Sequence, residues 1–118
     1  MALPKFTLLV SLVFMHVMAT FIHHGWANYD QEKPLDYTGT IESVVFENPH
    51  ATAKINLNKK TWTVILAPTS RMEERGIKPT MLKKGATVRV VGYPHREIKD
   101  EMRAERIFIQ DKKFELRR

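Results

Sequence analysis

Residues 51–67, ATAKINLNKKTWTVILA, decide the fold of this chain. In the first half, apolar and polar residues alternate with a period of two, as in a half-buried strand. The second half returns as a run rich in β-branched and aromatic residues, and Asn58, Lys59 and Lys60 form a short polar turn between them. The sequence therefore predicts a β-hairpin. Its inward-facing residues are Ala51, Ala53, Ile55 and Leu57 from one strand and Trp62, Val64 and Leu66 from the other.

Three further runs have the composition of strands. They are YTGTIESVVFE at 37–47, ATVRVVGYP at 86–94 and MRAERIFIQD at 102–111. Gly39 lies inside the first run, and a glycine within a strand indicates a bulge or a sharp bend. In the second run, Ala86, Val88 and Val90 share one face. With the hairpin, these runs make five strands.

One short helix interrupts the strands. Pro68 ends the third strand, Ser70 and Glu73 have the spacing of a capping box, and Gly76 can close the segment, so residues 70–76 are predicted to be helical. A punctuated turn, KPTMLKKG at 78–85, follows. The order of three strands, one helix and two strands predicts an all-β fold with one short helix, a five-stranded OB-like barrel spanning 36–118. An SH3-like barrel is the alternative, but it lacks an equivalent helix.

The chain begins with a segment that has the features of an export signal. Lys5 precedes an apolar run at 6–22, and Ala19 offers a cleavage position. If the run is retained, its seventeen residues would extend about 26 Å as a helix, enough to cross a slightly thinned bilayer. Residues 1–22 are therefore expected to form an apolar helix, either a signal peptide or an uncleaved signal anchor. The domain would be periplasmic, secreted or anchored on the outer side of the inner membrane.

Composition narrows the chemistry. The chain has no cysteine, which excludes disulfides, thiolate metal sites and cysteine nucleophiles. The net charge of +6 favours anionic partners of any kind, but a nucleic acid is not expected outside the cytoplasm. There is neither a glycine-rich phosphate loop nor a nucleophile motif, so we expect a protein that is not an enzyme.

Aromatic residues are the candidates for partner binding. Residues 23–35 read as an extended arm, in which Trp26 and Tyr29 interrupt a polar stretch. Together with Tyr93 they could contact a protein partner. Because OB-like barrels commonly bind extended polymers, the exposed cations Lys54 and Arg89 could contribute charge to such a surface, whereas Trp62 is expected in the core.

Histidines are the candidate metal ligands. Imidazole suits copper, zinc and nickel, so His23, His24 and His50 could bind copper if the arm folds back toward the loop that contains His50. Pro49 would hold His50 at a defined place on the rim of the barrel. The alternative is that His50 stabilises its turn and that the histidine pair belongs to a solvated arm. His95 is expected at the surface.

Five short motifs carry a resemblance: HHGW at 23–26, TGTI at 38–41, NPHA at 48–51, GYP at 92–94 and RAERI at 103–107. In their order and spacing they resemble a bacterial family of small exported proteins of unassigned function. The resemblance covers residues 23–110 and implies an extracytoplasmic location and an OB-like fold. It implies no activity. VMATFI stands at 17–22, where the family has an Ala-x-Ala site.

Two functional classes follow. The first is an extracytoplasmic, non-catalytic binding or accessory module with a protein partner, which could be a small subunit of an integral inner-membrane complex. The second is a periplasmic copper-binding protein that uses the N-terminal histidines and His50. No cofactor is required in the first class, and copper is the cofactor in the second.

Overall fold

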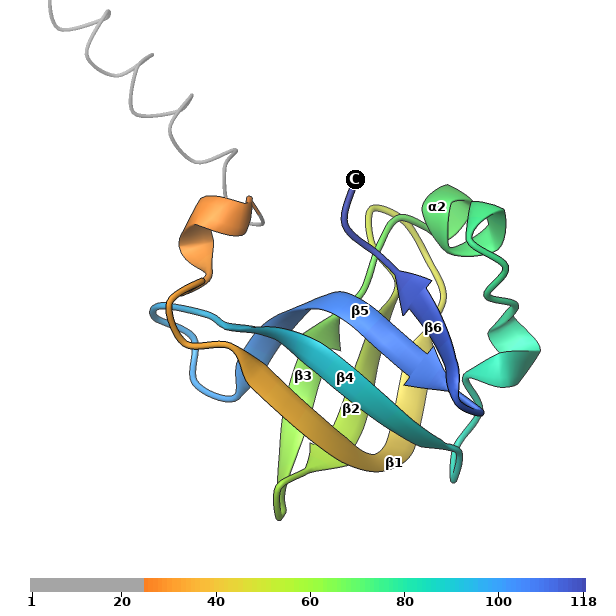
Figure 1. Cartoon of the computed structure of the whole chain (residues 1–118), viewed down its shortest axis with the longest axis horizontal. Coiled ribbons are helices and arrows are strands. Elements are labelled where there is room, and N and C mark those ends of the chain that lie inside the picture. Colours follow the sequence, from red (N-terminus) through yellow and green to blue (C-terminus); the bar gives the residue numbers. More distant parts are fainter. Residues whose placement is uncertain (1–24) are drawn as a thin grey trace, which may run out of the picture.

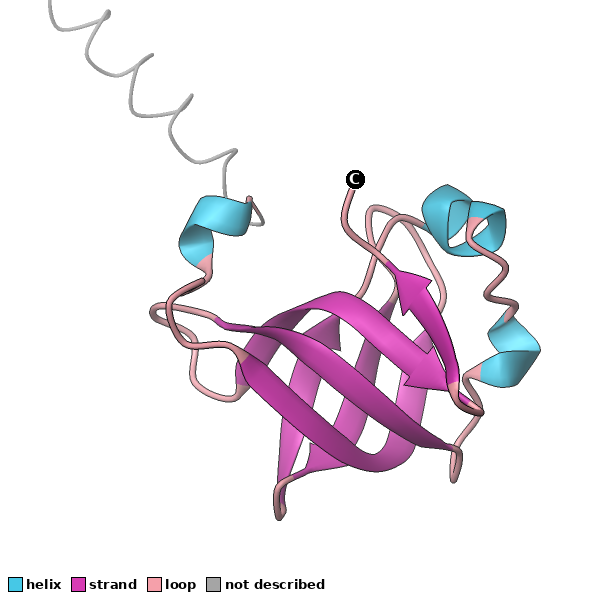
Figure 2. Ribbon diagram, in the orientation of Figure 1, coloured by secondary structure: helices cyan, strands magenta, loops and turns pink. Residues whose placement is uncertain are grey.

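The computed structural model describes residues 25–118, and strands are its main regular elements (Figures 1 and 2). The strands are β1 (Leu35–Val45), β2 (Thr52–Leu57), β3 (Lys60–Ile65), β4 (Thr87–Pro94), β5 (Glu101–Ile109) and β6 (Lys112–Glu115). The helical elements are η1 (Trp26–Asn28), α2 (Thr69–Glu74) and η2 (Pro79–Met81). The predicted order of three strands, a helix and two strands is confirmed, and β6 is an additional strand. The predicted apolar N-terminal helix lies outside the described residues.

The strands close into a barrel. Their order in the sheet is β3-β2-β1-β4-β5-β6, and a further parallel pairing between β3 and β5 joins the ends of the five-stranded part. This pairing, which we call the closing seam, joins only residues 63–65 to residues 101–103. β6 pairs with the second half of β5. The barrel is thus closed by three residue pairs between strands that are distant in the sequence.

β1 bends so that it can pair with two neighbours. Its first half pairs with β4 and its second half with β2, while Gly39 and Thr40 pair with both. A Cβ atom on Gly39 would come within 1.7 Å of the carbonyl oxygen of Asn56. The glycine is therefore required by the close approach of β2, and the register shift lies just beyond it, between Ile41 and Ser43. The bend predicted at Gly39 is confirmed.

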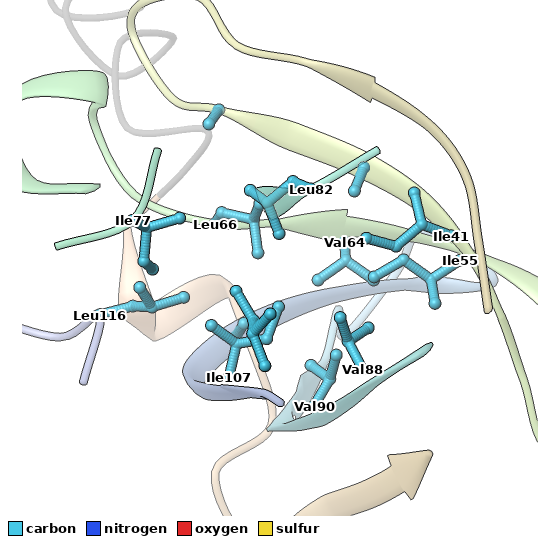
Figure 3. Close-up of a cluster of buried hydrophobic side chains, with 14 of the residues drawn as sticks. Ile41, Ile55, Val64, Leu66, Ile77, Leu82, Val88, Val90, Ile107 and Leu116 are labelled. Atoms are coloured by element: carbon cyan, nitrogen blue, oxygen red, sulfur yellow. The ribbon is translucent and has the colours of Figure 1, made fainter. Parts of the chain in front are cut away.

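The core is built from the inward faces of the strands (Figure 3). The hairpin is confirmed, since β2 and β3 pair in register around Asn58 and Lys59, which both have positive φ angles. All of its predicted inward residues are buried, including Trp62. Loop and helix residues close the barrel, and the residues outside the strands that join the core include Leu66, Met72, Ile77, Leu82 and Leu116.

The predicted capping of the helix was wrong. α2 begins at Thr69, its N-cap position is Pro68, and no side chain caps it through a hydrogen bond. Ser70 is exposed inside the helix. Thr69 donates a hydrogen bond from its hydroxyl to the side-chain oxygen of Asn48, 2.9 Å away. The start of the helix is thereby tied to the loop between β1 and β2, a long-range contact that a local motif cannot indicate.

Candidate functional site

The arm that precedes β1 is fixed to one end of the barrel by Tyr29. The side chain of Tyr29 is fully buried, and its hydroxyl donates a hydrogen bond to a carboxylate oxygen of Glu101 at 2.9 Å. Its ring lies edge-on to His95, with 5.0 Å between the ring centroids. Burial, with the hydrogen bond to Glu101 adding to it, raises the pKa of Tyr29 above its usual value. Because Glu101 belongs to the closing seam, the arm is attached at the seam itself.

Trp26 makes the second attachment. The guanidinium groups of Arg103 and Arg117 each lie 4.3 Å from the centre of its ring, in cation–π geometry. The ring also meets Tyr93 edge-on at 6.2 Å. Arg117 donates a further hydrogen bond to the side-chain oxygen of Gln31 at 2.9 Å. Arg103, in the closing seam, and Arg117, near the C-terminal end of the chain, thus both hold Trp26 of the arm against the barrel.

Backbone hydrogen bonds complete the attachment. The amide of Asp30 donates to the carbonyl of Pro94 at 2.8 Å, and the amide of Arg96 donates to the carbonyl of Asn28 at 2.9 Å. Tyr29 forms an isolated bridge with His95. The arm therefore extends the sheet beside the end of β4.

The predicted partner-binding residues lie together, but they differ in burial and in the contacts that their side chains make. The side chain of Tyr29 is fully buried in the described part of the chain. Tyr93 is half-buried, and its hydroxyl donates to Glu105 at 3.0 Å. Trp26 is half-buried under the two arginines. These three aromatic residues attach the arm, and the contact of Trp26, Tyr29 and Tyr93 with a protein partner remains a prediction.

At the other end of β4 the surface is hollowed into a groove of about 870 Å³. Its walls come from η2, from the start of β4 and from the turn between β5 and β6. The first three residues of β4 line the groove, and the arm is attached at its last residue, Pro94, so Arg89 and Pro94 are separated by roughly 17 Å along the strand. Apolar side chains and polar ones line it together, among them Thr38, Met81, Lys83, Thr87, Arg89, Phe108 and Asp111.

One ion pair organises the wall of this groove. Arg89 binds Asp36 through two hydrogen bonds, of 2.8 and 2.7 Å. Its guanidinium group also lies 4.5 Å from the centre of the Phe108 ring. The hydrogen bonds from Arg89 hold the pKa of Asp36 below its usual value. The planar guanidinium group of Arg89 is thus held in one orientation, exposed to solvent and beside the aromatic ring of Phe108.

The structure places one of the three predicted metal ligands. His50 is half-buried in the loop between β1 and β2, next to the cis Asn48–Pro49 bond. In Figure 1 this loop lies at the same end of the barrel as η1. His23 and His24 lie outside the described residues. Within residues 25–118, no three His, Asp or Glu side chains gather closely enough to hold a metal ion.

His95 is less exposed than expected. It is half-buried, and its Nδ1 atom accepts hydrogen bonds from the amides of Glu97 and Ile98, at 3.0 and 2.9 Å. Its role is to shape the loop between β4 and β5. The sequence did not indicate the groove, because the groove depends on strands that meet only in the folded chain. The available signal was the outward alternation of Arg89 and Phe108 along their strands.

Comparison with family profiles places the chain in a family without an assigned function. None of the helical segments in the described part of the chain has the length and apolar character needed to cross a membrane. No curated protein matches the chain. A family profile matches residues 11–103, which covers the barrel from β1 to the seam as well as the arm. The chain therefore belongs to DUF6152, a family of unknown function.

Proposed function

We propose that this protein is an exported, non-catalytic binding and accessory module that works on the outer side of the inner membrane and engages a protein partner. Its barrel is of the OB-like kind. This assignment is supported by five strands in a closed sheet, a helix between β3 and β4, and a strand β1 shared by β2 and β4. Folds of this kind serve most often as binding platforms.

The proposal rests on the difference between the two ends of β4. One end holds the arm, which follows the apolar residues 6–22, and the other end presents the open groove. A domain tethered at the arm would direct its groove away from the bilayer. The groove combines an aromatic surface with fixed hydrogen-bond donors, which suits a segment of a protein partner better than a purely apolar ligand.

Crosslinking in intact cells tests the partner. A photo-reactive residue at Thr87, in the groove, is expected to capture one discrete protein, and Lys83→Glu in the same chain is expected to reduce the yield. Thr61 is the matched control position, because it is also an exposed threonine on a strand but lies outside the groove. The same product from both positions, or none from Thr87, would contradict the binding role of the groove.

Location is tested separately. A protease added to spheroplasts is expected to digest the tagged domain while a cytoplasmic marker survives. The mass of the chain recovered from membranes then shows whether residues 1–22 are retained. A domain that remains protected until the cells are lysed would contradict export.

Copper binding remains the second candidate, favoured by one observation: the loop with His50 and the start of the described chain lie at the same end of the barrel (Figure 1). Titration of the mature protein with Cu(II), followed by its visible absorption, tests it. A stoichiometric site that is lost in His50→Ala would support it, whereas titration without a saturating signal would reject it.

A further inference from the structure

Ile98 is one of two large hydrophobic side chains that the described residues expose to solvent. It is 49 % exposed, and the other, Val45, is 50 % exposed. Ile98 lies in the loop between β4 and β5, with Glu97 before it and Lys99 after it. Single exposed apolar side chains are common on protein surfaces, so Ile98 has to be considered together with the residues and the chain segments around it.

This loop is held rigidly against the arm. The side chain of Arg96 donates a hydrogen bond from Nε to the carbonyl of Ala27 at 3.0 Å, in addition to the backbone bond to Asn28. The two amides bound by His95 fix the turn that carries Ile98. In Figure 1 the loop projects beside the segment that joins η1 to β1. The position of Ile98 is therefore set relative to η1, and not only relative to the barrel.

The length of chain outside the described residues limits where η1 can be. The apolar run ends at Ile22, three residues before Gly25. Three residues extend at most about 10 Å. If the run stays in the bilayer, the arm must lie at the membrane surface, and Trp26 falls where tryptophan is enriched in membrane proteins.

Charged side chains of both signs surround Ile98, and two of the exposed ones are cations. Arg96 is 53 % exposed, 3.9 Å from Asp30, and Lys99 is exposed as well. The neighbouring acids are Glu97, which is exposed, and Asp100, whose carboxylate binds Lys60 at 3.2 Å. The long side chains of Arg96 and Lys99 can bind phosphate groups while the apolar side chain beside them enters the interface.

We infer that Ile98, with Arg96, Lys99 and Trp26, forms a membrane-contact surface that rests on the phospholipid headgroups of the bilayer holding residues 6–22. Ile98 enters the interfacial layer, and the cations contact phosphates. The inference rests on the proposed export and on retention of the apolar run. It adds an orientation: the loop between β4 and β5 faces the lipid, and the groove faces away.

The absence of cysteine allows a direct test, because Ile98→Cys and Val45→Cys each create a single labelling site. The full chain carrying a nitroxide at either site is reconstituted into vesicles of phosphatidylethanolamine and phosphatidylglycerol. Collision with a water-soluble nickel complex is then measured by electron paramagnetic resonance. We expect the label at position 98 to be roughly threefold less accessible than the label at position 45, as for a side chain in the interfacial layer.

The outcomes separate this inference from the proposed function. Equal accessibility at both positions, in a chain that resists extraction by alkaline carbonate, would overturn the membrane contact and leave the anchored module intact. A chain released by carbonate would contradict the anchor, and the inference would fall with it. Protection of position 98 in native membranes but not in protein-free vesicles would overturn the lipid contact and assign the surface to a protein partner.

Discussion

The two ends of β4 are built in opposite ways. At Pro94 the arm covers the barrel with a fully buried tyrosine and a tryptophan under two arginines. At Thr87 the surface is open, and its main side-chain interaction, between Arg89 and Asp36, lies in solvent. Because the side chains at the first end are buried, substitutions there should lower the stability of the fold strongly. At the second end water screens the ion pair, so substitutions there should lower the stability little. The arm end is thus the tightly packed end of β4, and the groove end is the open one.

The largest difference between the ends should come from Tyr29. Tyr29→Ala removes a buried aromatic ring and leaves Glu101 without its hydrogen bond, so we expect a loss of about 4 kcal/mol in the free energy of unfolding. Phe108→Ala, at the groove end, is the control, because its ring is only half-buried. Urea denaturation of the two variants compares them directly. Equal losses would show that the arm end is not the more tightly built of the two.

Glycines at the two ends provide the second comparison. A Cβ atom on Gly92 would lie 2.3 Å from the carbonyl oxygen of Arg103, whereas one on Gly85 would meet nothing within 4 Å. We expect Gly92→Ala to cost about 3 kcal/mol, since the backbone of β5 must move. Gly85→Ala should cost about 1 kcal/mol, from its positive φ angle alone. Thermal unfolding of both variants would test the order, and the reverse order would refute the close approach of β4 and β5.

The hydroxyl of Tyr29 should shape the response to alkali. Its pKa is raised in the folded chain, so the folded state keeps the proton more firmly than the unfolded state. The stabilisation is complete below the usual tyrosine pKa of about 10 and declines as the pH rises from there toward the raised value. Tyr29→Phe should cost about 2 kcal/mol near neutrality and should flatten this alkaline decline. Denaturation midpoints measured across the alkaline range test it, and an unchanged slope would contradict it.

The arginine above Trp26 should have a local effect. Arg117→Ala removes a cation–π contact and the bond to Gln31, so we expect a loss of about 1 kcal/mol. The loss should appear as faster hydrogen exchange of the Asn28 and Asp30 amides. Amides in β2, far from the arm, are the internal control. Uniform acceleration throughout the barrel would mean that the contact supports the whole domain and not the arm.

The smallest effect should come from the groove. Asp36→Asn weakens an exposed ion pair, so stability should change little and less still at high salt. Because the pKa of Asp36 is lowered in the folded state, its contribution is present above the usual aspartate value of about 4 and is lost as the pH falls below it. Acid denaturation of the variant should therefore be slightly less steep. A large loss at neutral pH would show that the groove wall is structural.

Local pattern predicted the parts of this fold that depend on local physics. The alternation in 51–57 identified β2 and its buried face, and Gly39 marked the bend of β1. β6 escaped prediction because its four residues, KKFE, contain two lysines and only one apolar residue. Ser70 had the spacing of a cap, yet Pro68 occupies that position. Local spacing cannot say which contacts the rest of the chain will make.

The candidate site shows the same limit. Tyr29 stood in a polar stretch, where nothing local distinguishes a buried tyrosine from an exposed one. Its burial depends on Glu101 and His95, which lie more than sixty residues further along the chain. The groove likewise combines η2 with the ends of β4 and β5. The residue types were visible in the sequence, and their juxtaposition was not.

The closing seam affects how this protein folds and how readily proteases can cleave it. Three residue pairs join segments that lie 38 positions apart in the sequence. The chain between them must therefore lose conformational entropy before these pairs can stabilise the fold. The arm binds at Glu101 and Arg103, on one side of that seam. We therefore expect the arm to bind to the barrel at the same stage of folding at which β3 pairs with β5. Transient opening of the barrel, and with it cleavage by proteases, is governed by how often the arm detaches.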